Sequence, residues 1–226
     1  MGQCIPALAA AAMLVAGLGG SGRAAEPESG KVPILYSTDL FHPHVDPDDH
    51  YDLATLFALE EFDIRGIILD NAVGARWIKR YGYRDQKQTC GRPAVEQMMH
   101  ITRRQAPCVI GLQRPLESRT DKAADDPAEL QGGVELILKT LRESKEPVVL
   151  FSVGSCRDIA VACNRDPELM RTKVKAYYPN VGTGPSGPQP DYNVTIDPEA
   201  YARVFDARLA VCWSPCVGKE GYLTEY

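Results

Sequence analysis

The sequence lacks an excess of basic residues, a paired cysteine motif and internal repeats, and the first two absences each argue against a class of protein. Lysine and arginine number 25 against 30 acidic residues, whereas binding to a nucleic-acid backbone requires clustered basic side chains that displace counterions. No CxxC pair and no CxxC…HxxxH spacing occurs, which disfavours a structural zinc site. We therefore expect no nucleic-acid partner, and small polar ligands remain open.

The sequence also has no apolar run long enough for a comfortable membrane span. Its longest run, IPALAAAAMLVAGLGG at residues 5–20, has the length of a signal-peptide core. Gly22 and Ala24 suit the −3 and −1 positions of a cleavage site. We expect an exported protein, periplasmic or extracellular, with no stable membrane span after cleavage. The expected organisation is a signal peptide over residues 1–24, a linker over 25–31 and one α/β domain over 32–226.

Cysteine usage agrees with export but leaves the pairing open. Removal of Cys4 with the signal peptide leaves six cysteines, at positions 90, 108, 156, 163, 212 and 216. An even number in an exported protein permits disulfide bonds. Disulfides and buried free thiols are both favoured over a metal site.

Short apolar runs alternate along the chain with segments that have apolar residues at helical spacing. The expected strands are 32–37, 64–71, 108–112, 147–153, 174–181 and 209–214, and the expected helices include 94–104, 127–143 and 197–207. A further helix is expected after the first strand, with Asp48 and Asp49 at its start. This succession predicts an α/β fold, a mainly parallel open sheet with helices on both faces and a Rossmann-like core. Ligands bind such sheets beyond the carboxyl ends of the strands.

An acidic segment follows the first expected strand. Residues 38–52, TDLFHPHVDPDDHYD, contain five carboxylates: Asp39, Asp46, Asp48, Asp49 and Asp52. So many like charges need protonation, exposure or a cation to neutralise them. Calcium takes six to eight oxygen ligands, so the segment suits it. A solvated acidic turn that caps the next helix is the alternative interpretation.

A second metal interpretation uses the same segment. His42-Pro43-His44 is an HxH pair, the opening motif of amidohydrolases, at the end of a first strand. That fold requires further histidines on later strands. Beyond this segment the chain has only His100, which lies in an expected helix. We therefore do not favour an amidohydrolase.

Four stretches together resemble the inosine-uridine preferring nucleoside hydrolase family. The acidic segment, with Ser37-Thr38-Asp39 and then Asp46-Pro47-Asp48-Asp49, is similar to the family's Asp-rich stretch of the DTDPGxDDAxAL kind, although the Pro-Gly is missing. The other three are IRGIILDN (64–71), LFSVGSCRDIAVA (150–162) and DYNVTIDPEAYARVF (191–205). The last is the most specific, since it is similar to the family's EFNxxxDPEAAxxVF.

The resemblance implies calcium-dependent hydrolysis of N-glycosidic bonds in nucleosides or related ribosides. The implied calcium ligands are Asp39, Asp48, Asp49, Asp52 and the main-chain carbonyl of Val153. Asp39 is the implied general base, and the implied ribose ligands are Asn71, Asp48, Asp191 and Asn193. Read without the resemblance, Asn71 is a residue of a turn, and Asp191 and Asn193 form an Asx-turn before a helix capped at Asp197.

Two further expectations concern what the family has and this sequence does not. Family members carry a late His-Asp pair that supplies a leaving-group acid and further ligands, and nothing similar follows Cys216. The resemblance therefore implies a C-terminally incomplete member, and a non-catalytic calcium and sugar-binding domain is the alternative function. A homo-oligomer also remains open. The aromatic residues Trp77, Tyr177, Tyr178 and Trp213 either stack on a nucleobase or belong to the core.

Overall fold

The computed structural model describes residues 30–41, 47–70, 91–183 and 191–215. The predicted signal peptide over 1–24, most of the predicted linker and the candidate ribose ligand Asn71 lie outside these residues. So do Asp46 and the His42-Pro43-His44 motif. Among the residues that are described, no helix has the length and apolar character needed to cross a membrane.

The fold is organised around one sheet of five parallel strands. Their bounds are Val32–Thr38 (β1), Phe62–Leu69 (β2), Cys108–Ile110 (β3), Val148–Ser152 (β4) and Val174–Pro179 (β5). The strand order is β3-β2-β1-β4-β5, so β1 lies at the centre between β2 and β4. Parallel neighbours need crossover connections, and helices supply them. The predicted α/β fold with a parallel sheet is confirmed.

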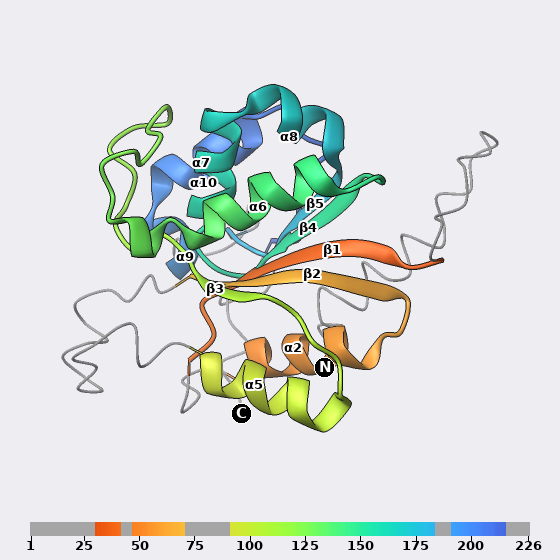
Figure 1. Cartoon of the computed structure of the whole chain (residues 1–226). Helices are drawn as coiled ribbons and strands as arrows, with labels where there is room; N and C mark the ends of the chain where they lie inside the picture. The colour runs from red at the N-terminus through yellow and green to blue at the C-terminus, as the bar shows by residue number, and fades with distance from the viewer. Residues whose placement is uncertain (1–29, 42–46, 71–90, 184–190, 216–226) are drawn as a thin grey trace.

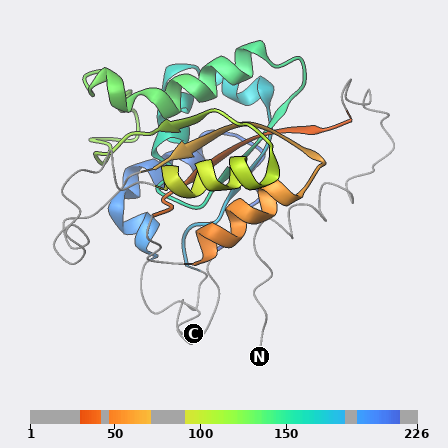
Figure 2. The ribbon, with the colours of Figure 1, turned by 60° about the horizontal axis from the view of Figure 1, so that its bottom comes forward.

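Helices cover both faces of this sheet (Figure 1). One face carries α6 (Gly132–Glu143), α7 (Arg157–Arg165), α8 (Pro167–Lys173) and α10 (Pro198–Asp206). The opposite face carries α2 (Asp48–Ala58) and α5 (Arg92–Thr102), which pack against each other and come forward together in Figure 2. Two short elements, η1 (Ala128–Leu130) and α9 (Tyr192–Ile196), complete the described helices.

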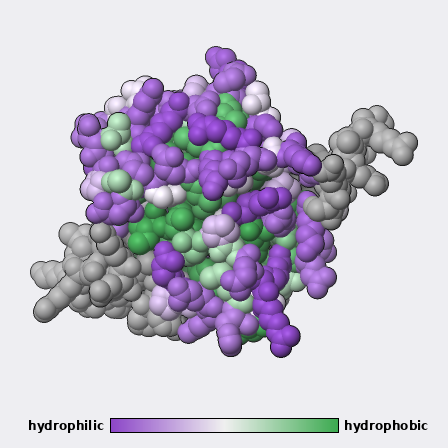
Figure 3. Space-filling view, viewed as in Figure 1, coloured by the Kyte–Doolittle hydropathy of each residue, from purple (hydrophilic) through white to green (hydrophobic). Residues whose placement is uncertain are grey.

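The strands build two hydrophobic cores because successive side chains point to opposite faces. Leu35 and Leu150 pack with α6 and α7, whereas their neighbours Tyr36 and Phe151 pack with α2 and α5. Burial on both faces explains why the strand sequences are almost continuously apolar. In the space-filling view, polar side chains cover most of the surface, and apolar ones show across the middle, between the two helix layers (Figure 3).

Two expected elements differ from the observed ones, and one observed helix was not expected. The expected strand 209–214 makes only an isolated bridge, between Val211 and Tyr177, because its apolar composition does not determine how many residues pair. The expected helix over 127–143 is divided at Gln131, where η1 ends and α6 begins. Helix α9 was not expected, since five residues are too few to show a helical period.

None of the four cysteines among the described residues forms a disulfide bond. Cys108 and Cys212 are half-buried, and Cys156 and Cys163 are buried. Burial raises the pKa of both buried thiols to about 12, so they stay protonated and unreactive. The buried-thiol interpretation therefore holds for Cys156 and Cys163, while Cys90 and Cys216 lie outside the described residues.

Candidate functional site

Three neighbouring strands deliver their carboxyl ends to one place. Asp39 follows β1, Asp70 follows β2 and Gly154 lies in the turn after β4. The Asp70 N–H donates to the Thr38 carbonyl at 2.8 Å, which continues the pairing of β1 with β2 past the sheet. A Cβ atom at Gly154 would lie 2.8 Å from Asp70 Oδ2 and 3.1 Å from the Asp39 nitrogen. Only glycine lets this turn approach the two aspartates so closely.

The first turn of α2 brings a second carboxylate to Asp39. Thr38 Oγ1 donates to Asp49 Oδ1 at 3.1 Å, and the charge of Asp39 acts on the Asp49 carboxyl. The Asp49 N–H also donates to Asp48 Oδ1 at 2.9 Å. Asp48 and Asp49 occupy the first turn, where the positive end of the helix dipole favours negative charge. The acidic segment therefore folds back onto the end of β1.

The Asp39 and Asp49 carboxyl groups have raised pKa values. Burial, followed by the charges of Asp70 and Asp48, raises the pKa of Asp39 well above its ordinary value. Burial, followed by Asp39 and Asp48, does the same for Asp49. At neutral pH each of these carboxyl groups must either carry a proton or bind a cation, because a buried negative charge beside another one is destabilising. This electrostatic conflict is the one that the five carboxylates of the sequence predict.

Asp52 lies one turn further along α2 and is 5% exposed. Burial, followed by the charge of Asp48, raises its pKa to about 7. Its charge also raises the pKa of Asp49 and that of the buried Tyr36 phenol. Asp52 therefore belongs to the same group of acidic residues as Asp49, one turn further along α2.

The predicted carbonyl ligand and the predicted ribose ligand meet each other. Asn193 Nδ2 donates to the Val153 carbonyl oxygen at 2.9 Å, so α9 is joined to the turn after β4. Asn193 Oδ1 is buried and, among the described residues, has no hydrogen-bond partner. One end of this amide is thus engaged, and the other end is available to a donor such as a hydroxyl group.

Asp191 has a structural role in this arrangement. Its Oδ2 accepts hydrogen bonds from the N–H groups of Gly182 at 3.1 Å and Val194 at 3.3 Å. The side chain therefore caps α9 and holds the chain after β5. This capping agrees with the structural interpretation of Asp191 as part of an Asx-turn before a helix. Asp197 likewise caps α10, by accepting from the Ala200 N–H.

Sequence reasoning missed three buried charged residues beneath the site: Asp70, Arg157 and Asp158. Both oxygens of Asp158 accept from the Leu112 N–H, at 3.3 and 3.2 Å. A Cβ at Gly111 or Gly133 would collide with this carboxyl group. Burial, followed by the charge of Asp70, raises the pKa of Asp158 to about 7. The sequence does contain a signal that could have identified them. Asp70 directly follows an apolar strand, and Arg157 and Asp158 stand at the start of an apolar helix.

The aromatic candidates for base stacking divide between core and surface. Tyr177 and Tyr178 are buried, and Tyr177 OH lies 2.7 Å from Ser152 Oγ. For these two residues the core interpretation holds. Trp213 is 42% exposed and donates from Nε1 to the Val181 carbonyl at 2.7 Å, whereas Trp77 lies outside the described residues.

The donor atoms at this site are of the type that calcium binds, but the described side chains are not grouped as a complete metal site. Two carboxylates and a main-chain carbonyl are hard oxygen donors of the type that calcium selects. In the described part of the chain, however, no three histidine, cysteine or acidic side chains are grouped so as to hold a metal ion. The Val153 oxygen already accepts from Asn193 Nδ2, which leaves its second lone pair for a cation. A cation held by Asp39, Asp49 and Val153 would therefore lie beside the Asn193 amide.

Carboxylates gathered beyond the carboxyl ends of a parallel sheet define an α/β protein with a small-ligand site at the usual position for this architecture. The family model of the inosine-uridine preferring nucleoside hydrolases matches residues 45–219. The chain belongs to this family.

Individual relatives agree with the family match. The pyrimidine-specific ribonucleoside hydrolases RihA of Enterobacter sp. (strain 638) and Citrobacter koseri are 38% identical over 80 residues, which is 34% of this chain and 26% of each relative. The inosine-uridine preferring nucleoside hydrolase of Bacillus anthracis superposes with a TM-score of 0.57 at 15% identity, covering 81% of this chain and 64% of that one. The plant nucleoside hydrolase PpNRh1 gives 0.53 at 15% identity, covering 81% and 59%. The chain therefore spans about a quarter of the length of these curated relatives and about three fifths of the two structures.

Proposed function

We propose that this protein hydrolyses the N-glycosidic bond of nucleosides or related ribosides and that calcium supports the reaction. The observation that carries the proposal is the position of Asp49, bonded to Thr38, next to Asp39 and beside the Gly154 turn, in a chain of the nucleoside hydrolase family. Two neighbouring carboxyls with raised pKa values suit a site that holds a cation and moves a proton.

Asp39 is the general base in this proposal. It takes a proton from a water molecule whose oxygen attacks the anomeric carbon, while the N-glycosidic bond breaks and the nucleobase leaves with the electron pair. The departing base takes its proton from solvent. Calcium, when bound by Asp39, Asp49 and the Val153 carbonyl, with Asp48 and Asp52 as further candidates, supplies a Lewis acid that makes water more acidic.

The ribose is oriented by groups on two sides of Asp39. Asn193 presents its free Oδ1 from α9, and Asp48 is exposed at the start of α2. Asn71 and Asp191 complete the proposed set, although Asp191 Oδ2 is already engaged in capping. Holding the sugar in one orientation removes rotational freedom before the reaction, which lowers the barrier.

Release of reducing sugar from inosine and uridine by the full chain tests this function. We expect release in calcium, no release after chelation, and none from Asp39→Ala. Asp63→Asn is the matched control, because Asp63 is a strand aspartate that pairs with Arg65 away from the carboxyl ends. Equal release by wild type and Asp39→Ala would refute the assignment of the base.

A non-catalytic calcium and sugar-binding domain is the second candidate. The buried Asn193 Oδ1 supports it, because this acceptor has no hydrogen-bond partner among the described residues and a sugar hydroxyl could satisfy it without any hydrolysis. Thermal stabilisation by ribose and calcium without release of reducing sugar would support this function over hydrolysis. The exported location remains a prediction from the apolar run at residues 5–20, and fractionation of expressing cells tests it.

A further inference from the structure

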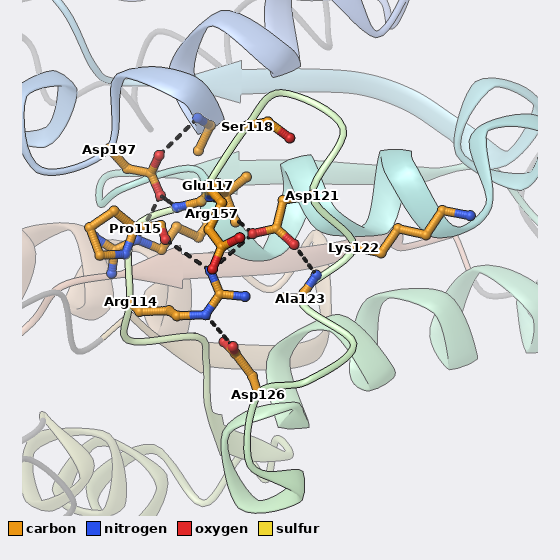
Figure 4. A network of polar contacts seen from close by, with 12 residues as sticks. Arg114, Pro115, Glu117, Ser118, Asp121, Lys122, Ala123, Asp126, Arg157 and Asp197 are labelled. Carbon is orange, nitrogen blue, oxygen red and sulfur yellow. Dashed lines mark hydrogen bonds and ion pairs between the residues drawn. The ribbon is translucent and has the colours of Figure 1, made fainter.

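Arg157, the first residue of α7, makes an unusual number of contacts for a buried side chain. It is 2% exposed and donates from all three of its nitrogens. Nε donates to Asp197 Oδ2 at 2.8 Å, Nη1 to the Gln113 carbonyl at 2.8 Å and Nη2 to the Ile196 carbonyl at 3.1 Å. Figure 4 shows this side chain reaching Asp197. The planar guanidinium is the only side chain that can satisfy three acceptors in these directions.

The acceptors of Arg157 belong to the segment that carries Asn193. Ile196 ends α9, and Asp197 caps α10 while accepting from the Leu116 N–H at 3.0 Å. At the other end of α9, Asn193 reaches the Val153 carbonyl, four residues before Arg157. The segment is therefore fixed to the turn after β4 at two points, one through Asn193 and the other through Arg157.

Arg157 also faces the carboxylate behind Asp39. Its Nη1 lies 4.0 Å from Asp70 Oδ1, which is buried and has no hydrogen-bond partner among the described residues. The other oxygen, Asp70 Oδ2, accepts from the Ser155 N–H at 2.5 Å. Asp70 Oδ2 and the Asp39 nitrogen both approach the Cα of Gly154 so closely that an added Cβ there would lie 2.8 Å from one and 3.1 Å from the other. A shift of Asp70 would therefore be felt at Asp39 through this turn.

A nearby arginine shows what a purely structural network looks like. Arg114 binds Asp121 and Asp126, and its side chain is 35% exposed (Figure 4). These partners lie within the loop between β3 and α6, and none of them touches Asp39, Val153 or Asn193. Arg157 differs because its contacts converge on the proposed site.

We infer that Arg157 is a positioning residue of this site: it sets where Asn193 lies relative to the Val153 carbonyl and holds Asp70 beside Asp39. The inference rests on the proposed function only for the identity of the ligand. A buried ion pair is by itself a weak reason for stability. Its contacts instead explain how a five-residue helix keeps Asn193 in one place.

A double-mutant cycle separates positioning from general stability. Arg157→Lys keeps the charge but cannot make the three bonds, and a misplacement of about 1 Å costs about 100-fold in rate. We expect Arg157→Lys and Asn193→Ala each to lower kcat/KM for uridine by about that factor. The double variant should lose clearly less than the product of the two single losses, because both changes remove the contribution made through Asn193. Independent, multiplying losses would overturn the inference.

Two further variants distinguish loss of positioning from a general effect of replacing an arginine. Arg114→Lys is the control and should change kcat/KM less than twofold. Asp197→Asn breaks the same link from the other side while retaining a residue that can cap α10, so it should reproduce Arg157→Lys. Full activity in Asp197→Asn would count against the inference even if Arg157→Lys fails to fold.

Amide hydrogen exchange tests the inference without any turnover. In Arg157→Lys we expect faster exchange in residues 191–200, including the Val194 and Ala200 amides, and unchanged exchange there in Arg114→Lys. If the wild type releases no sugar from any nucleoside, the proposed function fails, and the cycle is repeated on thermal stabilisation by ribose. Unchanged exchange in residues 191–200 of Arg157→Lys would refute the positioning role in either case.

Discussion

Asn193 and Val153 are joined by a hydrogen bond from the side-chain amide to the main-chain carbonyl, with Nδ2 and O 2.9 Å apart. The family resemblance gave these residues separate roles, one as a ribose ligand and the other as a calcium ligand. The structure shows that they are not independent. A carbonyl oxygen has two lone pairs, so the Val153 oxygen can bind a cation while it accepts from Asn193. The bond then holds the Asn193 amide beside the cation, with its unpartnered Oδ1 left for a sugar hydroxyl.

Replacement of Asp39 tests the general base. Asp39→Asn retains the shape of the side chain but not its ability to accept a proton, so we expect kcat to fall by about 100-fold or more. Binding of ribose, measured by thermal stabilisation, should change much less. A fall in ribose binding with unchanged kcat would instead make Asp39 a sugar ligand.

Calcium should stabilise the fold through the Asp39–Asp49 pair. A ligand that binds only the folded state raises the melting temperature as its concentration rises. We expect millimolar calcium to raise the melting temperature of the wild type, and chelation to reverse the effect. Asp49→Asn should lose most of this rise, whereas Asp125→Asn, in an exposed part of the β3–α6 loop, should keep it. An equal rise in both variants would place the cation elsewhere.

Asp158 makes the stability of the fold depend on pH. Burial, followed by the charge of Asp70, raises its pKa to about 7, compared with about 4 in an unfolded chain. Between these values the folded state binds more protons than the unfolded state, so the free energy of unfolding decreases as pH rises. Without calcium we therefore expect a lower melting temperature near about pH 8 than near about pH 5.

The matched variant isolates the contribution of Asp158. Asp39, Asp49 and Asp52 also have raised pKa values and act in the same direction. Asp158→Asn can still accept from the Leu112 N–H but has no proton to lose, so its melting temperature should depend less steeply on pH. The same slope in wild type and Asp158→Asn would show that this carboxyl group does not titrate in the folded state over this range.

Gly154→Ala tests the close approach of the turn after β4. The added methyl group would lie 2.8 Å from Asp70 Oδ2 and 3.1 Å from the Asp39 nitrogen. Overpacking of this kind typically costs about 1–3 kcal/mol, and here it also moves the general base. We expect a lower melting temperature and a larger fall in kcat than the loss of stability alone explains. Wild-type activity in this variant would mean that the site tolerates movement of Asp39.

The sequence predicts which segments form the central strands better than it predicts how far each segment pairs. The runs at 32–37 and 147–153 are apolar because both faces of their strands are buried, so they could be recognised without knowing their neighbours. The segment 209–214 is equally apolar but makes one isolated bridge to Tyr177. Composition indicates that a segment can pair, whereas the length of pairing depends on what lies beside it.

The candidate site was predictable only where its residues are close in sequence. Asp39, Asp48 and Asp49 stand within one acidic segment, and their meeting at the start of α2 follows from that spacing. Arg157 and Asp197 are 40 residues apart and meet only because α7 and α10 share a face of the sheet. A single arginine at a helix start gives no indication of such a partner, so this part of the site emerged from the structure alone.

A crystal structure determined with calcium and ribose tests the account most directly. We expect a calcium ion within about 2.3–2.6 Å of oxygens from Asp39, Asp49 and the Val153 carbonyl, with Asn193 Oδ1 accepting from a ribose hydroxyl. A structure at saturating calcium and ribose that shows no ion beside Asp39, and no ribose hydroxyl at Asn193, would contradict it.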